Sequence, residues 1–272
     1  MKYLLLSLTA VFWAGLSPAQ ADEPAIIAKA RAYLGSDAAL DAVSSVHLSG
    51  TVSGENPSNV ISKSWTASVE IIFQKPWQES LMIRYPTQIV HTALDDFEAW
   101  QHIQEHTNPG QTVIDVTRAS NLIVFNALQV KNLRADTWNN LYFYRGIERV
   151  GGTITDEGPA TIDGVACEKI VFYHSPAIIY TRYFDLATGR LVFTQTRAGT
   201  RIRESGEIMA GGIRFPRTIM SSETSSKGGV ISSTYHFDKV VLNESFPESS
   251  FSVPLLPISN DTEPLFSPAP GH

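Results

Sequence analysis

Cysteine is almost absent from this chain of 272 residues, since Cys167 is the only one. An intramolecular disulfide is therefore excluded, and the fold must be stabilised by burial of apolar side chains. A lone thiol in an apolar strand is typical of a small core residue. No local signature pairs Cys167 with His174 as a catalytic nucleophile and its base.

Basic residues and recognisable catalytic motifs are also scarce. The chain has 21 Lys and Arg against 27 Asp and Glu, a net charge of −6, and no basic stripe. This balance excludes nucleic acid as an expected partner. There is no G-x-S-x-G elbow, Walker loop or dinucleotide fingerprint. We therefore predict a protein that is not an enzyme and needs no cofactor.

The chain begins with the pattern of a secretory signal peptide over residues 1–21. Lys2 supplies the positive charge, residues 3–16 are apolar, and Pro18 precedes an A-x-A cleavage site at residues 19–21. No later stretch approaches the about 18 apolar residues of a membrane span. With no cysteine beside the cleavage site to carry a lipid, we expect a soluble protein in the periplasm or outside the cell.

The mature part is predicted to be one domain with a tail. Residues 22–253 have the length of a single mainly β domain. Residues 254–272 contain five prolines and few packing residues. They are predicted to form a flexible, extended tail.

Helical periodicity occurs in two regions. In residues 24–43 apolar side chains recur at helical spacing, with a break at Gly35 and a possible cap at Asp37. Residues 119–129 are predicted as a second helical stretch, and residues 138–144 continue an apolar and aromatic surface.

Alternation with a period of two fills most of the remaining chain. In residues 65–73 the odd positions are apolar, and most of the even positions are polar, so one face of this strand is apolar. Similar segments are bounded by turn residues, and the glycine pairs that begin at 151, 211 and 228 are predicted hairpin turns. The other predicted strands span residues 47–53, 77–85, 88–93, 97–104, 160–164, 167–173, 178–185, 190–196, 201–209, 213–220 and 230–241.

These elements predict a fold that is mainly β with α. The short connections indicate a strongly curved antiparallel sheet, or half-barrel, of about ten strands. The N-terminal helix and the mid-chain helical insertion are the elements available to cover its apolar face.

One short motif is formally catalytic. His102, Glu105 and His106 match the H-x-x-E-H pattern of some zinc proteases. That chemistry needs a long helix and a third ligand, whereas Pro109 and Gly110 end any helix at once. The favoured interpretation is a hairpin tip with surface histidines, and a zinc hydrolase is kept as an alternative.

Aromatic side chains on the predicted apolar faces are the candidate ligand-lining residues. Each can equally be an ordinary core residue, but together they can line a cavity for an acyl chain, since ligand cavities are largely apolar. The candidates are Trp65, Phe73, Trp77, Tyr85, Phe125, Phe172, Tyr183, Tyr235 and Phe237.

Several segments resemble LolA-like and LolB-like periplasmic proteins. Residues 183–192 are similar to their Y-x-D-x-x-T-G-x-x hairpin, and residues 211–216 to their dGi-x-x-P strand. Residues 240–254 follow the ending v-x-x-N-x-x-x-x-x-x-F-x-x-P, and residues 162–167 resemble the idG-x-x-c/a strand. The resemblance covers most of residues 24–254.

The resemblance implies an eleven-stranded half-barrel closed by helices over a hydrophobic cavity. It also implies a carrier of lipoproteins between membranes or a sensor of lipid-like ligands, with a membrane-bound donor or acceptor. We therefore expect a soluble periplasmic carrier or binding protein for lipids or lipidated proteins. The alternative from another class is an envelope interaction or sensor module with a filled core.

Overall fold

The structure, a computed structural model, describes residues 23–55, 64–105, 121–225 and 228–254. The residues of the expected signal peptide, and all of the expected tail except Pro254, lie outside these ranges. The strands are β1 (Ser45–Glu55), β2 (Ser64–Gln74), β3 (Gln78–Arg84), β4 (Gln88–Asp95), β5 (Glu98–Glu105), β6 (Asn121–Val124), β7 (Thr153–Ile162), β8 (Val165–Ser175), β9 (Ile178–Asp185), β10 (Leu191–Thr196), β11 (Arg201–Ala210), β12 (Ile213–Thr224) and β13 (Val230–Leu242).

The described strands form one antiparallel sheet of 13 strands, which confirms the predicted fold class. Their order is β6-β5-β4-β3-β2-β1-β13-β12-β11-β10-β9-β8-β7. The sheet therefore consists of two meanders, β1 to β6 and β7 to β13. Pairing of β1 with β13, from Val46↔Leu242 to Glu55↔Ser232, joins them.

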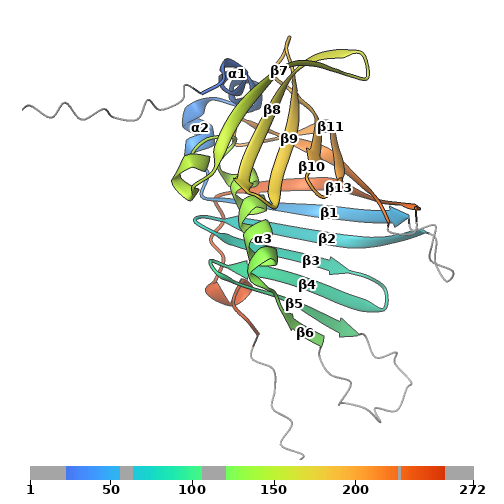
Figure 1. The fold of residues 1–272 in the computed structure, drawn as a ribbon. Coiled ribbons are helices and arrows are strands. Elements are labelled where there is room, and N and C mark those ends of the chain that lie inside the picture. Colours follow the sequence, from blue (N-terminus) through green and yellow to red (C-terminus); the bar gives the residue numbers. More distant parts are fainter. Residues whose placement is uncertain (1–22, 56–63, 106–120, 226–227, 255–272) are drawn as a thin grey trace, which may run out of the picture.

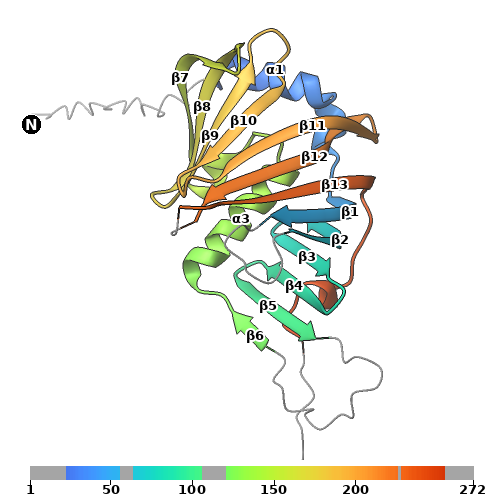
Figure 2. The ribbon, with the colours of Figure 1, turned by 90° about the vertical axis from the view of Figure 1, so that its right-hand side faces the viewer.

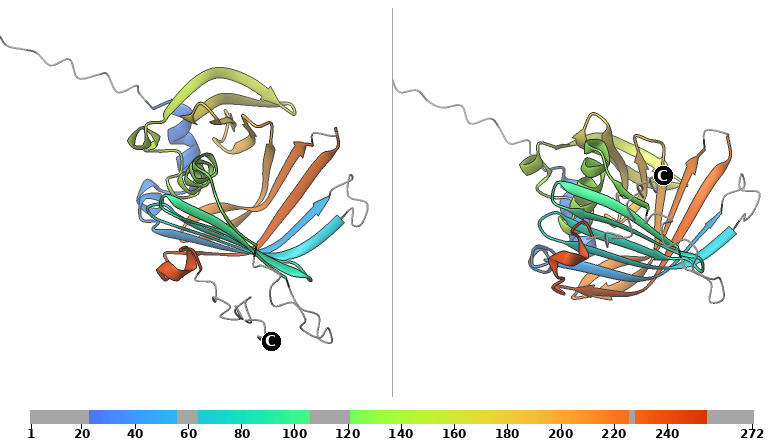
Figure 3. Two further views of the ribbon diagram at one scale, coloured as in Figure 1. Left: turned by 60° about the horizontal axis from the view of Figure 1, so that its bottom comes forward. Right: turned by 90° about the horizontal axis from the view of Figure 1, so that it is seen from below.

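Three α-helices accompany the sheet in the described residues: α1 (Ala25–Leu34), α2 (Asp37–Asp41) and α3 (Ala127–Leu141). There are also two short 3-10 helices, η1 (Ile147–Val150) and η2 (Glu248–Ser250). Helix α3 lies across β1 to β5 and also contacts β9 (Figure 1). A view from below shows the sheet curving around α3 (Figure 3). We call the side of the sheet that faces α3 the inner face.

The apolar core occupies the inner face in two clusters. One joins Val46, Val69 and Phe237 of the central strands to Leu141 and Phe143 at the end of α3. The other packs α1 and α3 against β8 and β9. Its members include Ile27, Trp138, Phe172 and Phe184. Because both clusters depend on α3, this helix holds the two meanders around a common interior.

Arg31 joins α1 to the chain that follows α3. Its side chain is 1% exposed, and it donates hydrogen bonds to the carbonyl oxygens of Tyr142 (3.4 Å) and Phe143 (3.0 Å). The same guanidinium pairs with Asp37 and Asp41, each at 2.8 Å. A buried cation with this number of partners is fully engaged. The contact fixes the N-terminal helices on the inner face.

The opposite, outer face of β1 to β5 is covered by the C-terminal segment (Figure 2). Trp100 Nε1 donates to the Phe251 carbonyl oxygen at 2.8 Å, and Phe251 is fully buried. The Phe246 ring lies 5.4 Å from the His47 ring, and its backbone N–H donates to Gln74. The C-terminal segment therefore covers the outer face at the end of the first meander that contains His47, Gln74 and Trp100.

The second helical prediction was wrong in position. Residues 121–124 form β6, which pairs with β5, and α3 begins at Ala127. The reason is a capping box: Asn126 accepts from the Leu128 and Gln129 N–H groups, and the Gln129 side chain accepts from the Asn126 N–H. This box fixes the helix start and leaves the preceding apolar residues free to pair as a strand.

Smaller corrections concern turns, caps and the strand number. The cap of α2 is Ser36, not Asp37, because its side chain accepts from the Ala39 N–H. Gly151 does not form a hairpin; it ends η1 with a φ of 77°, which favours glycine. The described sheet has 13 strands, more than the ten read from alternation or the eleven implied by the resemblance.

Among the described residues, no helix has the length and apolar character needed to cross a lipid bilayer.

The role of Arg31 can be measured by replacing it. Arg31→Met removes charged hydrogen bonds to two carbonyl oxygens, so we expect the free energy of unfolding to fall by about 1.5–3 kcal/mol. Lys131→Met on the exposed side of α3 is the matched control and should stay within about 0.5 kcal/mol of the unmodified protein. Urea unfolding measures both, and equal stability of the two variants would contradict this role.

Candidate ligand-binding face

Two rows of directly paired residues cross the inner face. Residues that pair directly in neighbouring antiparallel strands point to the same side of a sheet. The first row, from β8 to β2, is Ile170, Arg182, Thr194, Ile202, Ser221, Ser233, Gly54 and Trp65. The second row, from β11 to β2, is Glu204, Ile219, Tyr235, Val52 and Ala67.

The helices do not cover these rows completely. Val52 and Ala67 are buried in the core, whereas Ile202, Ile219 and Tyr235 remain partly exposed on the same face. Scattered surface aliphatics are ordinary, but a contiguous apolar patch marks a binding site. The inner face therefore continues as an apolar surface past the region that the core fills.

Aromatic rings gather at the β2 end of the rows. The Trp65 and Tyr85 ring centroids are 5.2 Å apart, and both residues are partly exposed. Burial raises the pKa of the Tyr235 hydroxyl, with a smaller contribution from Tyr85. Gly54 allows this arrangement, because a Cβ there would lie 2.3 Å from the Trp65 ring.

Polar groups gather at the opposite end of the rows. Asp136, on α3, accepts a hydrogen bond of 2.6 Å from the Tyr180 hydroxyl. Burial raises the pKa of Asp136 and of Glu204, while nearby Arg182 opposes the shift in each. Both carboxyl groups are partly exposed, so they face the same incompletely covered interior.

Arg182 is the cation of this polar group. Its guanidinium carbon lies 4.9 Å from the Phe172 ring centroid, 5.2 Å from that of Tyr144 and 5.6 Å from that of Tyr180. Burial, and then the charge of Arg182, lowers the pKa of His174 to about 4. The His174 side chain is therefore uncharged at pH 7.

Glu79 is a buried carboxyl group beneath α3. Burial, followed by the nearby Asp136, raises its pKa well above the ordinary value. The Thr137 hydroxyl lies 3.3 Å from Glu79 Oε2 and 3.0 Å from the Leu133 carbonyl oxygen. The Thr137 hydroxyl is the donor in both contacts, so its single proton is shared between the two acceptors.

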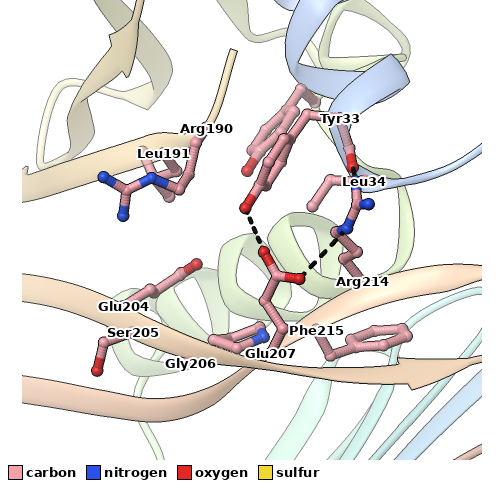
Figure 4. Close-up of a pocket in the computed structure, with 12 residues that line it drawn as sticks. Tyr33, Leu34, Arg190, Leu191, Glu204, Ser205, Gly206, Glu207, Arg214 and Phe215 are labelled. Atoms are coloured by element: carbon pink, nitrogen blue, oxygen red, sulfur yellow. Dashed lines mark hydrogen bonds and ion pairs between the residues drawn. The ribbon is translucent and has the colours of Figure 1, made fainter. Parts of the chain in front are cut away.

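A pocket of about 190 Å³ opens where β10 and β11 separate. These strands pair only at Thr194↔Ile202 and Gln195↔Arg201. In Figure 4, Leu191 lies on one side of the opening and Glu204 on the other. The pocket therefore gives solvent access to the polar end of the rows.

The rim of this pocket is fixed by polar contacts between α1 and the sheet. The Tyr33 hydroxyl donates to Glu207 Oε1 at 2.6 Å, and Arg214 donates to the Tyr33 carbonyl oxygen at 2.7 Å (Figure 4). Burial and then Glu207 raise the pKa of Tyr33.

A second pocket, of about 410 Å³, lies over β10 to β13 and is lined in part by Arg201, Arg203 and Met220. These residues alternate along their strands with the inner-face Ile202 and Ile219. The second pocket therefore belongs mainly to the outer face.

The structure brings together three of the nine aromatic candidates as a partly exposed group: Trp65, Tyr85 and Tyr235. Phe73, Phe172 and Phe237 are on the same face but buried in the core. They support the surface without forming its exposed part.

The other three candidates lie elsewhere. Trp77 stacks on Tyr142, with ring centroids 5.6 Å apart, and Phe125 packs beside a small separate cluster. Tyr183 alternates with Arg182 along β9 and packs against Phe193, 5.7 Å away, so it faces outward.

The formally catalytic residues are not assembled in the described structure. His102 lies in strand β5, as expected of a hairpin arm, and His106 lies outside the described residues. The described ranges contain no group of three side chains placed to bind a metal ion. Cys167 is buried and sits at the opposite end of β8 from His174.

Sequence reasoning missed Asp136, Arg182 and Glu204. For Arg182 a signal was available: Ile178, Tyr180 and Phe184 mark the apolar register of β9, and Arg182 occupies that register. A charge on the apolar face of a strand needs a partner or a function. The other two could be found only from the three-dimensional pairing.

The raised pKa of Glu79 makes a prediction about pH. A folded-state pKa above the unfolded value means that the native protein loses stability as the pH rises from about 4 through the folded pKa. Glu79→Gln lacks this titration, so its melting temperature relative to the unmodified protein should increase over that range. Glu98→Gln, an exposed control, should show no such trend. Parallel pH profiles for Glu79→Gln and the unmodified protein would contradict it.

Comparison with known proteins places the fold. No protein-family model and no curated protein sequence matches the chain. A DUF1329 family protein from Desulfovibrio piger matches over 84% of this chain and 96% of its own, with 9% identity and a TM-score of 0.52. A LolA superfamily protein from Nitrosomonas europaea matches over 82% and 97%, with 11% identity and a TM-score of 0.52. The chain therefore has a LolA-like fold, as its sequence resemblance indicates.

Proposed function

We propose that the protein binds the apolar chain of a lipid, or of a lipidated protein, along the two rows of the inner face. The observation that carries this proposal is the partial exposure of Ile202, Ile219 and Tyr235 on the face that also carries the apolar core. Covering such surface is worth about 25 cal/mol per Å². An acyl chain has the shape and the apolarity to supply that cover.

The arrangement of the rows supports an elongated ligand. The first row crosses the strands from β9 to β2, and neighbouring strands lie about 4.8 Å apart. No charged residue lies between Ile202 and Trp65 in this row. Ser221 and Ser233 have small side chains, which leaves room over the middle of the row for a chain, and the Trp65 ring lies over Gly54 at the end of the row.

The fold supports a carrier in particular. The LolA-like resemblance implies transfer of lipoproteins between membranes, and the expected signal peptide implies work outside the cytoplasm. We propose a periplasmic carrier that receives its ligand from one membrane-bound partner and releases it to another. An interaction module with a filled core is disfavoured by the exposed apolar residues of the inner face.

Two adjacent residues of β12 provide the test. Ile219 points into the inner face and Met220 points outward, and both carry exposed apolar surface. Ile219→Asp places a charge where the chain would lie, so binding of a fluorescent fatty-acyl probe should weaken by tenfold or more. Met220→Asp adds the same charge to the outer face and should bind like the unmodified protein.

Saturable binding measured by fluorescence titration of delipidated protein would support the proposal. Absence of binding to the unmodified protein, or equal loss in both variants, would contradict it. Circular dichroism of each variant verifies that the sheet is intact.

A further inference from the structure

We propose that Arg182 binds the acidic headgroup of the ligand, so that the preferred ligand is an amphiphile with one acyl chain and a carboxylate or phosphate group. This inference rests on the proposed function, because it assumes that a chain occupies the rows. It adds the chemical class of the headgroup and the orientation of the ligand.

The first observation is that Arg182 is a buried cation with unused donors. Its side chain is 7% exposed, and its Nε and Nη1 atoms are buried without a hydrogen-bond partner in the described residues. A buried donor without an acceptor is unfavourable, and more so when it belongs to a charged group. The faces of the surrounding rings stabilise the cation, but in the described residues neither Nε nor Nη1 donates to the Tyr144 or Tyr180 hydroxyl.

The second observation concerns the two nearby carboxyl groups. Arg182 acts electrostatically on Asp136 and Glu204, yet no carboxylate among the described residues lies within ion-pair distance of it. Asp136 already accepts from Tyr180. Burial raises the pKa of both carboxyl groups, which weakens their repulsion of an acidic headgroup.

The third observation is the position of Arg182 in the row. It pairs directly with Thr194, which pairs with Ile202, and the rest of the row as far as Trp65 carries no charge. A chain lying toward Trp65 therefore places its headgroup at Arg182. The pocket of about 190 Å³ opens beside Glu204 and Tyr144, which gives this end space for a polar group and its water.

An oxyanion at this position completes the site. An oxygen atom of the headgroup can accept a charge-assisted hydrogen bond from an unused N–H group of the guanidinium, which is the kind of contact that arginine makes with carboxylates and phosphates. The aromatic end of the row takes the end of the chain. The ligand is thus oriented by one charge and held by apolar contact.

The test compares headgroups on a constant chain. Hexadecanoate, hexadecyl phosphate and hexadecanol are titrated against the delipidated full-length protein by calorimetry at neutral pH. At least one acidic ligand should bind about tenfold or more tightly than the alcohol, since a charged hydrogen bond is worth about 1.5–3 kcal/mol. Whichever of hexadecanoate and hexadecyl phosphate binds more tightly identifies the preferred headgroup as a carboxylate or a phosphate.

Variants assign the preference to Arg182. Arg182→Met should still bind hexadecanol, and it should bind the two acidic ligands with an affinity similar to that for the alcohol. Arg182→Lys, which keeps the charge, should retain part of the preference and guards against a folding defect in the first variant. Arg203→Met, on the outer face of β11, should behave like the unmodified protein.

Three results overturn the inference in distinguishable ways. Equal affinity of the unmodified protein for the acids and the alcohol refutes the headgroup site but leaves chain binding intact. A preference that persists in Arg182→Met refutes the assignment to this residue. Failure of every ligand to bind refutes both the inference and the proposed function.

Discussion

The inner face of the sheet is larger than the helices that pack on it, and the proposed site follows from this mismatch. Apolar faces of sheets are normally buried against another layer. Here α3 crosses the first meander and reaches β9, and the core fills only the region around Leu141, Phe143 and Trp138. The remaining inner surface keeps Ile219 and Tyr235 partly exposed. A ligand, rather than another element of the described fold, is proposed to cover it.

Helix α3 also determines the chemistry of the interior. Three consecutive residues reach three parts of the sheet: Asp136 bonds to β9, Thr137 contacts Glu79 of β3, and Trp138 packs on Phe172 of β8. Helix α3 therefore both covers the apolar region and borders the polar region. A movement of α3 would change both regions at once. It would therefore couple the packing of the proposed acyl chain to the position of its proposed headgroup.

Local patterns predicted the strands well because each strand has one apolar side, as residues 65–73 show. They misplaced α3, since the apolar residues before Asn126 fit a helix or a strand, and only the capping box decides between them. Pairing of β1 with β13 is a long-range contact that no local pattern reveals. The sequence also could not tell which aromatic candidates are buried and which are partly exposed, because this depends on coverage by α3. The helix buries Phe172 and leaves Trp65 partly exposed.

Native mass spectrometry tests the central claim most directly. The full-length chain, exported in a host cell and purified without detergent, would be measured before and after incubation with an envelope lipid extract. The account predicts a fraction of protein with the added mass of one lipid-sized molecule, which mild detergent displaces. Only the mass of the bare chain in both conditions would contradict an open inner face that binds a lipid chain.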